Sequence, residues 1–225
     1  GVYAQRYDTN GNRLGGEFLV NTQTDNNQVK SSITTLNDGS FVVSWTSFQQ
    51  DGDGSGYGVF GQRYDLNGDP VEGEFQINTS IILDQENSSI AALNDGGFVV
   101  SWESQASGTG KEIHGQRYDM FGNAVDDEFQ VNTYTSAYQY QSSITALNDG
   151  GFVITWTSIG QDGSARGVYA QRFGPTESSV IFDQTVVESY AFDFQLQPDS
   201  FVDADINDNL FYTVTQEDGS ALPGW

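Results

Sequence analysis

A unit of about 55 residues is repeated along residues 1–173, and a fixed period of this length determines the architecture of a chain. Three sequence motifs recur with this period. Gln-Arg-aromatic occurs at Gln5–Tyr7, Gln62–Tyr64, Gln116–Tyr118 and Gln171–Phe173. A run from Leu through Asn-Asp-Gly to Trp occurs at Leu36–Trp45, Leu93–Trp102 and Leu147–Trp156. Glu-Phe-x-[Val/Ile]-Asn-Thr occurs at Glu17–Thr22, Glu74–Thr79 and Glu128–Thr133.

Each unit contains four candidate strands. Asn-Asp-Gly between β-rich runs is a strong hairpin signal, so the strand Ser31–Leu36 should turn into the strand Phe41–Trp45. The strand Gly58–Tyr64 should lead through the turn Asp65–Asp69 into a fourth strand, Glu74–Asn78. Alternation along Phe41–Trp45 predicts a sheet that is packed heavily on one face and partly covered on the other.

Four strands in a repeat of this length are typical of a β-propeller blade, so the sequence predicts an all-β, β-propeller-like fold. The expected units are a partial unit at 1–26, complete units at 27–80 and 81–134, and a partial unit at 135–173. Two complete units are few for a closed ring. An incomplete ring, closure by a neighbouring copy and an open stack therefore stay open as alternatives.

The pattern breaks after Phe173. We expect a linker at 174–179 and a new module at 180–225, where alternating apolar segments flank an acidic run at 203–208. This segment is short for a complete two-sheet sandwich, which predicts a partial β-sandwich or a strand-donating extension. Because Gly1 falls inside a repeat motif, we expect the chain to be part of a longer protein.

The composition excludes several classes of partner. The 31 acidic and 8 basic residues give a formal charge of −23, which repels nucleic acid phosphates and anionic lipid surfaces. No apolar stretch is long enough to span a membrane, so we expect neither nucleic acid binding nor membrane insertion. The absence of cysteine excludes disulfides, thiolate metal sites and cysteine nucleophiles, and it favours export weakly.

Calcium is the expected cofactor, because glycine-rich loops with many Asp and Asn supply the oxygen ligands that this ion prefers. The turn Asp65–Asp69 places side-chain oxygens at alternate positions, and the third copy of this turn has Phe121 at the central donor position. That replacement favours the alternative of an ordinary hairpin turn. The candidate ligands in the repeats are Asp51, Asp53, Asp65, Asn67 and Asp69.

Other repeated residues are expected to be structural. The repeated arginines should pair with carboxylates such as Asp38, Asp95 and Asp149; they are Arg6, Arg63, Arg117 and Arg172. Trp45, Trp102 and Trp156 should pack in the core rather than stack on sugars. His114, the one histidine, occupies the position of Tyr3, Phe60 and Tyr169 in the other copies. With no nucleophile elbow, phosphate loop or zinc-binding pair, the sequence predicts no enzyme.

The motifs resemble known repeats. Residues 1–173 are similar to repeats of very large secreted bacterial proteins, often found beside RTX-type calcium repeats and cadherin-like modules. Residues 186–225 resemble the start of a dystroglycan-type cadherin-like domain, through Phe201–Asp205, Leu210–Tyr212 and Asp218–Trp225. This resemblance implies an extracellular bacterial surface protein, and it implies calcium in the run 203–208 with Asp203, Asp205, Asn207 and Asp208 as the candidate ligands.

We therefore expect a non-enzymatic, extracellular structural or adhesive protein that is stabilised by calcium. Two alternatives stay open. One is a filament or matrix subunit that assembles by strand exchange between copies. The other is a carbohydrate-binding propeller. The expected partners are accordingly other copies of the chain or glycans of the cell surface and matrix.

Overall fold

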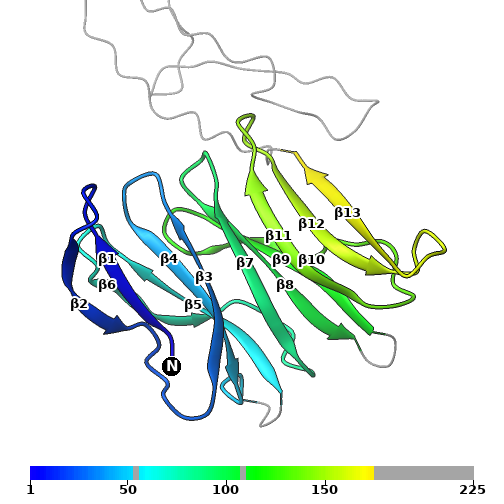
Figure 1. Cartoon of the computed structure of the whole chain (residues 1–225), viewed down its shortest axis with the longest axis horizontal. Coiled ribbons are helices and arrows are strands. Elements are labelled where there is room, and N and C mark those ends of the chain that lie inside the picture. Colours follow the sequence, from blue (N-terminus) through cyan, green and yellow to red (C-terminus); the bar gives the residue numbers. More distant parts are fainter. Residues whose placement is uncertain (53–55, 107–109, 175–225) are drawn as a thin grey trace, which may run out of the picture. The chain divides into compact units, whose positions relative to one another are not determined.

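The computed structural model describes residues 1–52, 56–106 and 110–174, and the chain divides into two units after Pro175. The predicted module at 180–225 and all of the linker except Gly174 lie outside the described residues. The described residues form thirteen β-strands and no helix, which confirms the all-β prediction (Figure 1). In this part of the chain no helix is long and apolar enough to cross a membrane.

The strands form four antiparallel sheets, which we call the first to fourth blades. The first blade contains β1 (Tyr3–Tyr7) and β2 (Arg13–Leu19). The second contains β3 (Gln28–Thr35), β4 (Phe41–Phe48), β5 (Tyr57–Tyr64) and β6 (Pro70–Gln76). The third contains β7 (Gln85–Ala92), β8 (Phe98–Ala106), β9 (Gly110–Tyr118) and β10 (Ala124–Gln130). The fourth contains β11 (Gln139–Ala146), β12 (Phe152–Ile159) and β13 (Arg166–Phe173).

The blades are arranged as the repeat predicted. Strands within a blade are paired in chain order, and β3, β7 and β11 lie next to one another across successive blades (Figure 1). The first strands thus form the inner edge of the array, and β6 and β10 lie at the outer edge. This is a β-propeller-like arrangement whose sheets do not close into a barrel.

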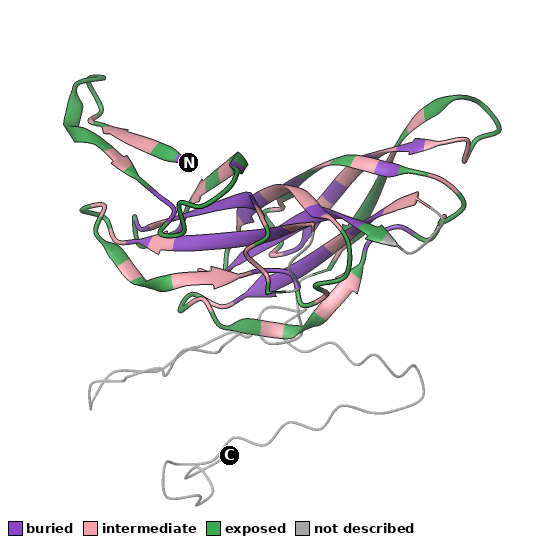
Figure 2. Ribbon diagram, turned by 90° about the horizontal axis from the view of Figure 1, so that it is seen from below, coloured by how far each residue is buried: buried purple, intermediate pink, exposed green. Residues whose placement is uncertain are grey.

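The core lies between blades. Val2 and Val20 of the first blade pack against Trp45 and Tyr64 of the second. Similar hydrophobic clusters lie at the next two interfaces: Trp102 is in the cluster between the second and third blades, and Trp156 is in the cluster between the third and fourth. Buried residues gather in the inner strands of the array (Figure 2). Since each inner blade lies between two others, the successive residues Val42 and Val43 of β4, which alternate between the two faces of the sheet, are both buried. The prediction of one partly covered face is therefore wrong for β4.

Candidate functional site

The two ends of the blades differ. At one end, every turn between first and second strands has the Leu-Asn-Asp-Gly sequence, and every turn between third and fourth strands has the same length. We call this the constant end. At the opposite, variable end the second strands end and the third strands begin, and the number of residues between the two strands differs from blade to blade. In repeat proteins such differences often gather on the face that binds a ligand.

The predicted calcium turn 65–69 is at the constant end and is closed by its own hydrogen bonds. Asp65 Oδ1 accepts from the backbone N–H groups of Asn67 and Asp69 at 2.8 and 2.9 Å. The bond from Asp69 lowers the pKa of Asp65 most. Asp119 accepts in the same way from Phe121 and Asn123. The turn therefore forms whether or not its central residue carries an oxygen donor.

The other candidate calcium ligands are not brought together in the described residues. Asp51 lies over Gly58 at the variable end, where an added methyl group would come within 3.3 Å of its Cβ. Asp53 and the four candidates in 203–208 lie outside the described residues. No three acidic, histidine or cysteine side chains gather around a metal position in the ranges that the structure describes. Calcium binding stays a prediction from the sequence.

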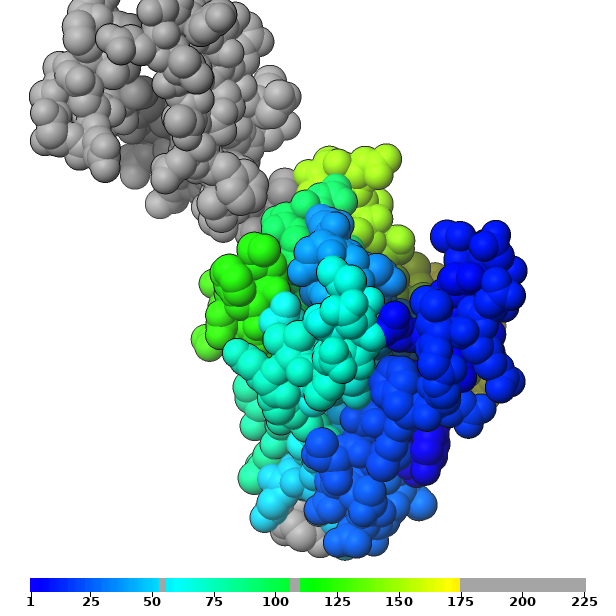
Figure 3. Space-filling model, turned by 90° about the vertical axis from the view of Figure 1, so that its left-hand side faces the viewer, coloured from blue at the N-terminus to red at the C-terminus, as the bar shows by residue number. Residues whose placement is uncertain are grey.

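The repeated motifs join successive blades. Glu74 Oε2 accepts from Thr22 N at 2.7 Å and Thr22 Oγ1 at 2.8 Å. Glu128 binds Thr79 in the same way, at 2.8 and 2.6 Å. The tyrosines of the Gln-Arg-aromatic motif also bond to the preceding blade; the pairs are Tyr64 Oη with Val20 O and Tyr118 Oη with Ile77 O. Figure 3 shows the first three blades following one another in chain order, from blue through cyan to green.

The arginine prediction is confirmed at two positions. Arg117 pairs with Asp95 at 2.7 Å, and Arg172 pairs with Asp149. Arg63 instead donates to the carbonyl groups of Met120 and Phe121 in the next blade.

Arg6 also lies against the next blade. A methyl group on Gly68, whose φ is +85°, would come within 2.6 Å of Arg6 Nη1. Glycine is thus required there both by the left-handed backbone and by the close approach of this side chain.

A β-bulge marks the first strand of the second, third and fourth blades near the variable end. Lys30, Asn87 and Gln141 occupy equivalent bulge positions with φ of 55–58°. The bulge N–H groups point to the preceding blade: Asn87 N donates to Thr46 Oγ1 at 3.1 Å, and Gln141 N donates to Glu103 Oε1 at 2.9 Å. β-Bulges, and residues other than glycine with a left-handed backbone, are over-represented beside functional sites.

The third blade departs from its sister blades at this end. Five ionisable residues stand where the second and fourth blades have other residues. Each residue of the third blade is given with its equivalents in the second and fourth blades, in that order: Glu86 with Val29 and Tyr140, Glu103 with Thr46 and Thr157, Lys111 with Tyr57 and Arg166, Glu112 with Gly58 and Gly167, and His114 with Phe60 and Tyr169. Since the blades share their core packing and the length of their constant-end turns, this concentration of ionisable residues in one blade identifies the candidate site.

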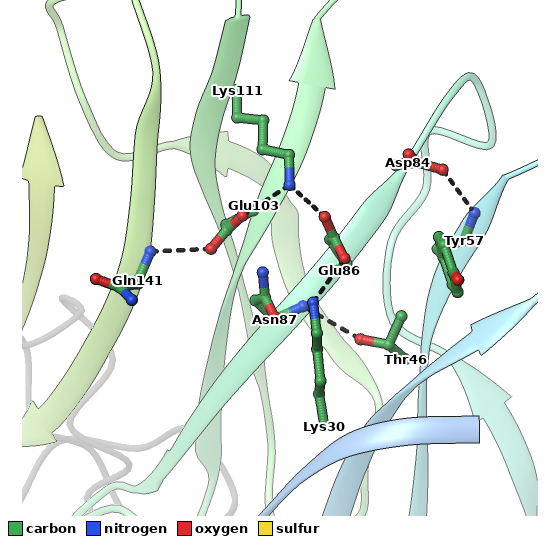
Figure 4. A network of polar contacts seen from close by, with 9 residues as sticks. All are labelled: Lys30, Thr46, Tyr57, Asp84, Glu86, Asn87, Glu103, Lys111 and Gln141. Atoms are coloured by element: carbon green, nitrogen blue, oxygen red, sulfur yellow. Dashed lines mark hydrogen bonds and ion pairs between the residues drawn. The ribbon is translucent and has the colours of Figure 1, made fainter. Parts of the chain in front are cut away.

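A charged cluster links three blades (Figure 4). Lys30 of the second blade binds Glu86 at 2.8 Å, and Lys111 binds both Glu86 and Glu103, the latter at 3.0 Å. Glu86 and Glu103 are direct cross-strand neighbours, and the side chain of Glu103 is only 3% exposed. Glu103 also accepts from Gln141 of the fourth blade. The cluster contains both lysines of the sequence.

The cluster is charge-paired at neutral pH. Burial alone would raise the pKa of Glu86, but hydrogen bonds from Lys111 and Lys30 outweigh burial and lower it. Burial alone would lower the pKa of Lys111, but its bonds to Glu86 and Glu103 raise it. The cluster therefore offers fixed charges and hydrogen-bonding groups.

The opposite face of the third blade carries a second ionisable group of residues. The position predicted for His114 is confirmed, because it pairs with Trp102 as Phe60 pairs with Trp45. Its Nδ1 also lies 2.8 Å from Glu128 Oε1, whereas Phe60 of the second blade has no polar side-chain atom for such a contact.

Replacing Glu112 by glutamine is expected to stabilise the protein at neutral pH by about 1 kcal/mol. Burial raises the pKa of Glu112, and its Oε1 atom is buried without a hydrogen-bond partner among the described residues. The folded state therefore holds the proton to higher pH than the unfolded state does, so ionisation above the folded pKa reduces stability. Urea unfolding of Glu112→Gln should show a larger gain at pH 8 than near pH 5; equal gains would contradict this assignment.

The fourth blade places different chemistry at the positions of Glu86 and Lys111. The guanidinium of Arg166 lies 5.8 Å from the ring centroid of Tyr140, a cation–π contact in place of the ion pair.

The connection between the second and third blades, residues 77–84, also lies at the variable end. It exposes the side chains of Ile81 and Ile82, and the backbone of Leu83 is left-handed. Each blade thus presents a different surface there on the same scaffold.

Sequence reasoning missed the charged cluster. The signal was the placement of both lysines and of neighbouring acids at positions where the sister repeats have neutral residues. The prediction that the tryptophans are core residues is confirmed by the burial of Trp45, Trp102 and Trp156.

Known proteins resemble this chain in structure but not in sequence. No protein family and no curated protein matches it. The α-L-arabinofuranosidase of Lactobacillus brevis has a TM-score of 0.51 at 11% identity, over 84% of this chain and 73% of the enzyme. An endo-arabinase of Bacteroides thetaiotaomicron has a TM-score of 0.42 at 11% identity, over 66% of this chain and 58% of the enzyme. A fucose lectin of Kordia zhangzhouensis has a TM-score of 0.37 at 12% identity, over 62% of this chain and 96% of the lectin. Only the first likeness is strong enough to inform the fold, and it agrees with the propeller-like arrangement.

Proposed function

We propose that this chain is a non-enzymatic, extracellular repeat module that binds neutral carbohydrate at the variable end of its blades. The observation that carries the proposal is the distribution of differences among the repeats. The blades share their core packing and the lengths of their constant-end turns, whereas the third blade has five ionisable residues near the variable end where its sister blades have other residues. A scaffold alone gives no reason for this asymmetry, whereas a recognition surface does.

The chemistry of the variable end supports a neutral polyhydroxylated ligand. The chain carries a charge of −23, which opposes phosphate-rich and other polyanionic ligands. Lys30 and the pair Tyr140–Arg166 combine charged donors with an aromatic ring, a combination that suits both the hydroxyl groups and the apolar faces of a sugar. The choice of carbohydrate is also supported by the likeness in fold to an arabinofuranosidase.

Binding without hydrolysis is supported by the state of the carboxylates. Glycoside hydrolysis usually requires one carboxylic acid with a raised pKa beside an ionised carboxylate. Glu86 is held ionised by its lysine partners, and Glu112, whose pKa is raised, is buried. Extracellular location is supported by the resemblance to secreted bacterial repeats and by the absence of cysteine.

The proposal is tested by screening the chain against an array of neutral glycans and measuring the affinity of each hit by calorimetry. We expect Lys30→Ala and Tyr140→Ala to weaken binding about tenfold or more, since each removes one good contact. The matched control is Phe121→Ala, which removes an exposed side chain at the constant end and should leave the affinity unchanged.

Two results would contradict the proposal. One is the absence of binding to every neutral glycan. The other is an equal loss of affinity in Phe121→Ala and the variable-end variants. Release of reducing sugar from a bound glycan would overturn the non-enzymatic part alone.

A further inference from the structure

The three connections between successive blades have the same length and the same hydrogen bonds. They are residues 20–27, 77–84 and 131–138. In each of them the asparagine of the Asn-Thr motif donates to the carbonyl group two residues later. The carbonyl group of the last residue accepts from the second strand of the following blade. The repeat therefore sets the backbone of the connection, and its exposed side chains can differ without changing the fold.

Among these three connections, 77–84 alone exposes a run of aliphatic side chains. Ile81, Ile82 and Leu83, which we call the aliphatic run, are 40, 68 and 38% exposed. The equivalent residues of the other two connections are polar or small: Thr24, Asp25 and Asn26, and Thr135, Ser136 and Ala137. Since the backbone is shared, the fold does not require aliphatic residues at these positions.

Leu83 is in addition unfavourable for the backbone that it adopts. Its φ is +61°, the same value that Asn26 has at the equivalent position. Asparagine tolerates this left-handed conformation, whereas a leucine side chain is disfavoured there. Folding alone therefore favours a polar residue, and a strained residue of this kind indicates a functional constraint.

The aliphatic run lies beside the charged cluster. Gln85 Nε2 donates to the Ile82 carbonyl at 3.1 Å, and the next residue, Glu86, binds Lys30. Asp84, which follows the run, accepts from Tyr57 N at 3.1 Å, so the connection is fixed to the second blade (Figure 4). Both flanking blades have four strands, so the exposure of the run does not come from either end of the chain. Apolar surface and hydrogen-bond donors thus adjoin where these blades meet.

We infer that the aliphatic run receives a methyl group of the bound sugar, so that the ligand is a neutral glycan with a deoxy or an acetamido sugar. This inference rests on the proposed function and names its ligand class. Aliphatic side chains cannot hydrogen-bond, so a sugar hydroxyl group held against them would lose its partners, whereas a methyl group gains by leaving water. The side chain of Lys30 is 46% exposed and supplies N–H donors for the hydroxyl groups of the same sugar.

The size of the run favours a small group over a protein partner. A standard protein interface buries roughly 800 Å² on each partner, and three side chains of one connection supply only a small part of that area. The charge of −23 also opposes the approach of a second copy of the chain. A methyl group, in contrast, can be covered by three aliphatic side chains.

Calorimetry of the full chain with paired glycans tests the inference. One pair ends in L-rhamnose or L-mannose, which differ by a methyl group in place of a hydroxymethyl group. The other ends in N-acetylglucosamine or glucose, so the two pairs separate the methyl group of a deoxy sugar from that of an acetamido group. In one pair we expect the methyl-bearing member to bind about fivefold more tightly, the effect of removing one methyl group from water.

The decisive variant is Ile81→Thr/Ile82→Ser/Leu83→Asn, which takes its residues from the sister connections. It should be at least as stable as the natural chain in urea, because asparagine suits the backbone at position 83. The preference for the methyl-bearing glycan should disappear, and the affinity for its partner should be unchanged. The matched control is Leu66→Thr, which replaces an exposed aliphatic side chain at the constant end by the residue of the equivalent Thr9 and should keep the preference.

The possible failures are distinguishable. Glycan binding without a preference in either pair, or with a preference that the triple variant keeps, would overturn the inference and leave the proposed function intact. Binding of no neutral glycan would overturn the proposed function and this inference with it. Light scattering covers the remaining occupant: self-association of the natural chain that the triple variant loses would make the run an interface between copies and would also overturn the inference.

Discussion

Replacing Lys111 by methionine is expected to lower the free energy of unfolding by about 2–4 kcal/mol at neutral pH, because the buried carboxylate of Glu103 loses its cation and Glu86 keeps only Lys30. Glu86 and Glu103 face each other directly across β7 and β8, and Lys111 binds both. Without it, two like charges remain opposed at a position where water reaches Glu103 poorly. Urea unfolding followed by tryptophan fluorescence measures the loss.

The sister blade supplies the matched rescue. Glu86→Val, Glu103→Thr and Lys111→Tyr together convert the site to the residues Val29, Thr46 and Tyr57 of the second blade. We expect this triple variant to regain most of the stability, because the carboxylates are removed together with their partner. A triple variant as unstable as Lys111→Met would show that the loss comes from packing rather than from unpaired charge.

The pH dependence has a definite sign. The lowered pKa of Glu86 adds stability above its unfolded value, near 4.3, which is lost as the pH falls through the folded pKa. The raised pKa of Lys111 adds stability below about 10.4, which is lost as the pH rises through its folded pKa. In Lys111→Met the carboxylates can instead be neutralised by protons, so its deficit should shrink from pH 8 to about pH 5. A constant deficit would contradict the electrostatic origin.

The blade could be predicted from the sequence because its signals are local. Asn-Asp-Gly turns and the Phe-Val-Val-Ser-Trp strand specify a hairpin within a few residues, and the period then repeats it. The pairing of Phe41–Trp45 with its neighbours and the burial of Trp45 follow from the same pattern. The covering of both faces of β4 did not follow, because it depends on how successive blades stack.

The candidate site could not be predicted for the same reason. Lys30 and Glu86 are far apart in sequence, and nothing local indicates that the bulges of β3 and β7 lie side by side. Arg63 shows the same limit: a carboxylate partner was the reasonable expectation in an acidic chain, yet backbone carbonyls of the next blade lie closer. Comparison of equivalent positions among the repeats would have found Glu86 and Lys111.

Replacing Glu128 by alanine is expected to cost about 2–3 kcal/mol, because a partly buried carboxylate and its charge-assisted hydrogen bonds are lost at once. Glu128 accepts from the backbone N–H and the hydroxyl of Thr79 in the preceding blade, and its other oxygen contacts His114. The substitution therefore removes contacts between blades and within one blade. Urea unfolding measures the total, and hydrogen exchange should show faster opening at Thr79 and its neighbours.

Glu17→Ala is the matched control, because Glu17 holds the equivalent position on β2 and is exposed. Its loss should change the free energy of unfolding by less than about 0.5 kcal/mol. Equal destabilisation by Glu17→Ala and Glu128→Ala would contradict the assignment of Glu128 as a contact that joins neighbouring blades.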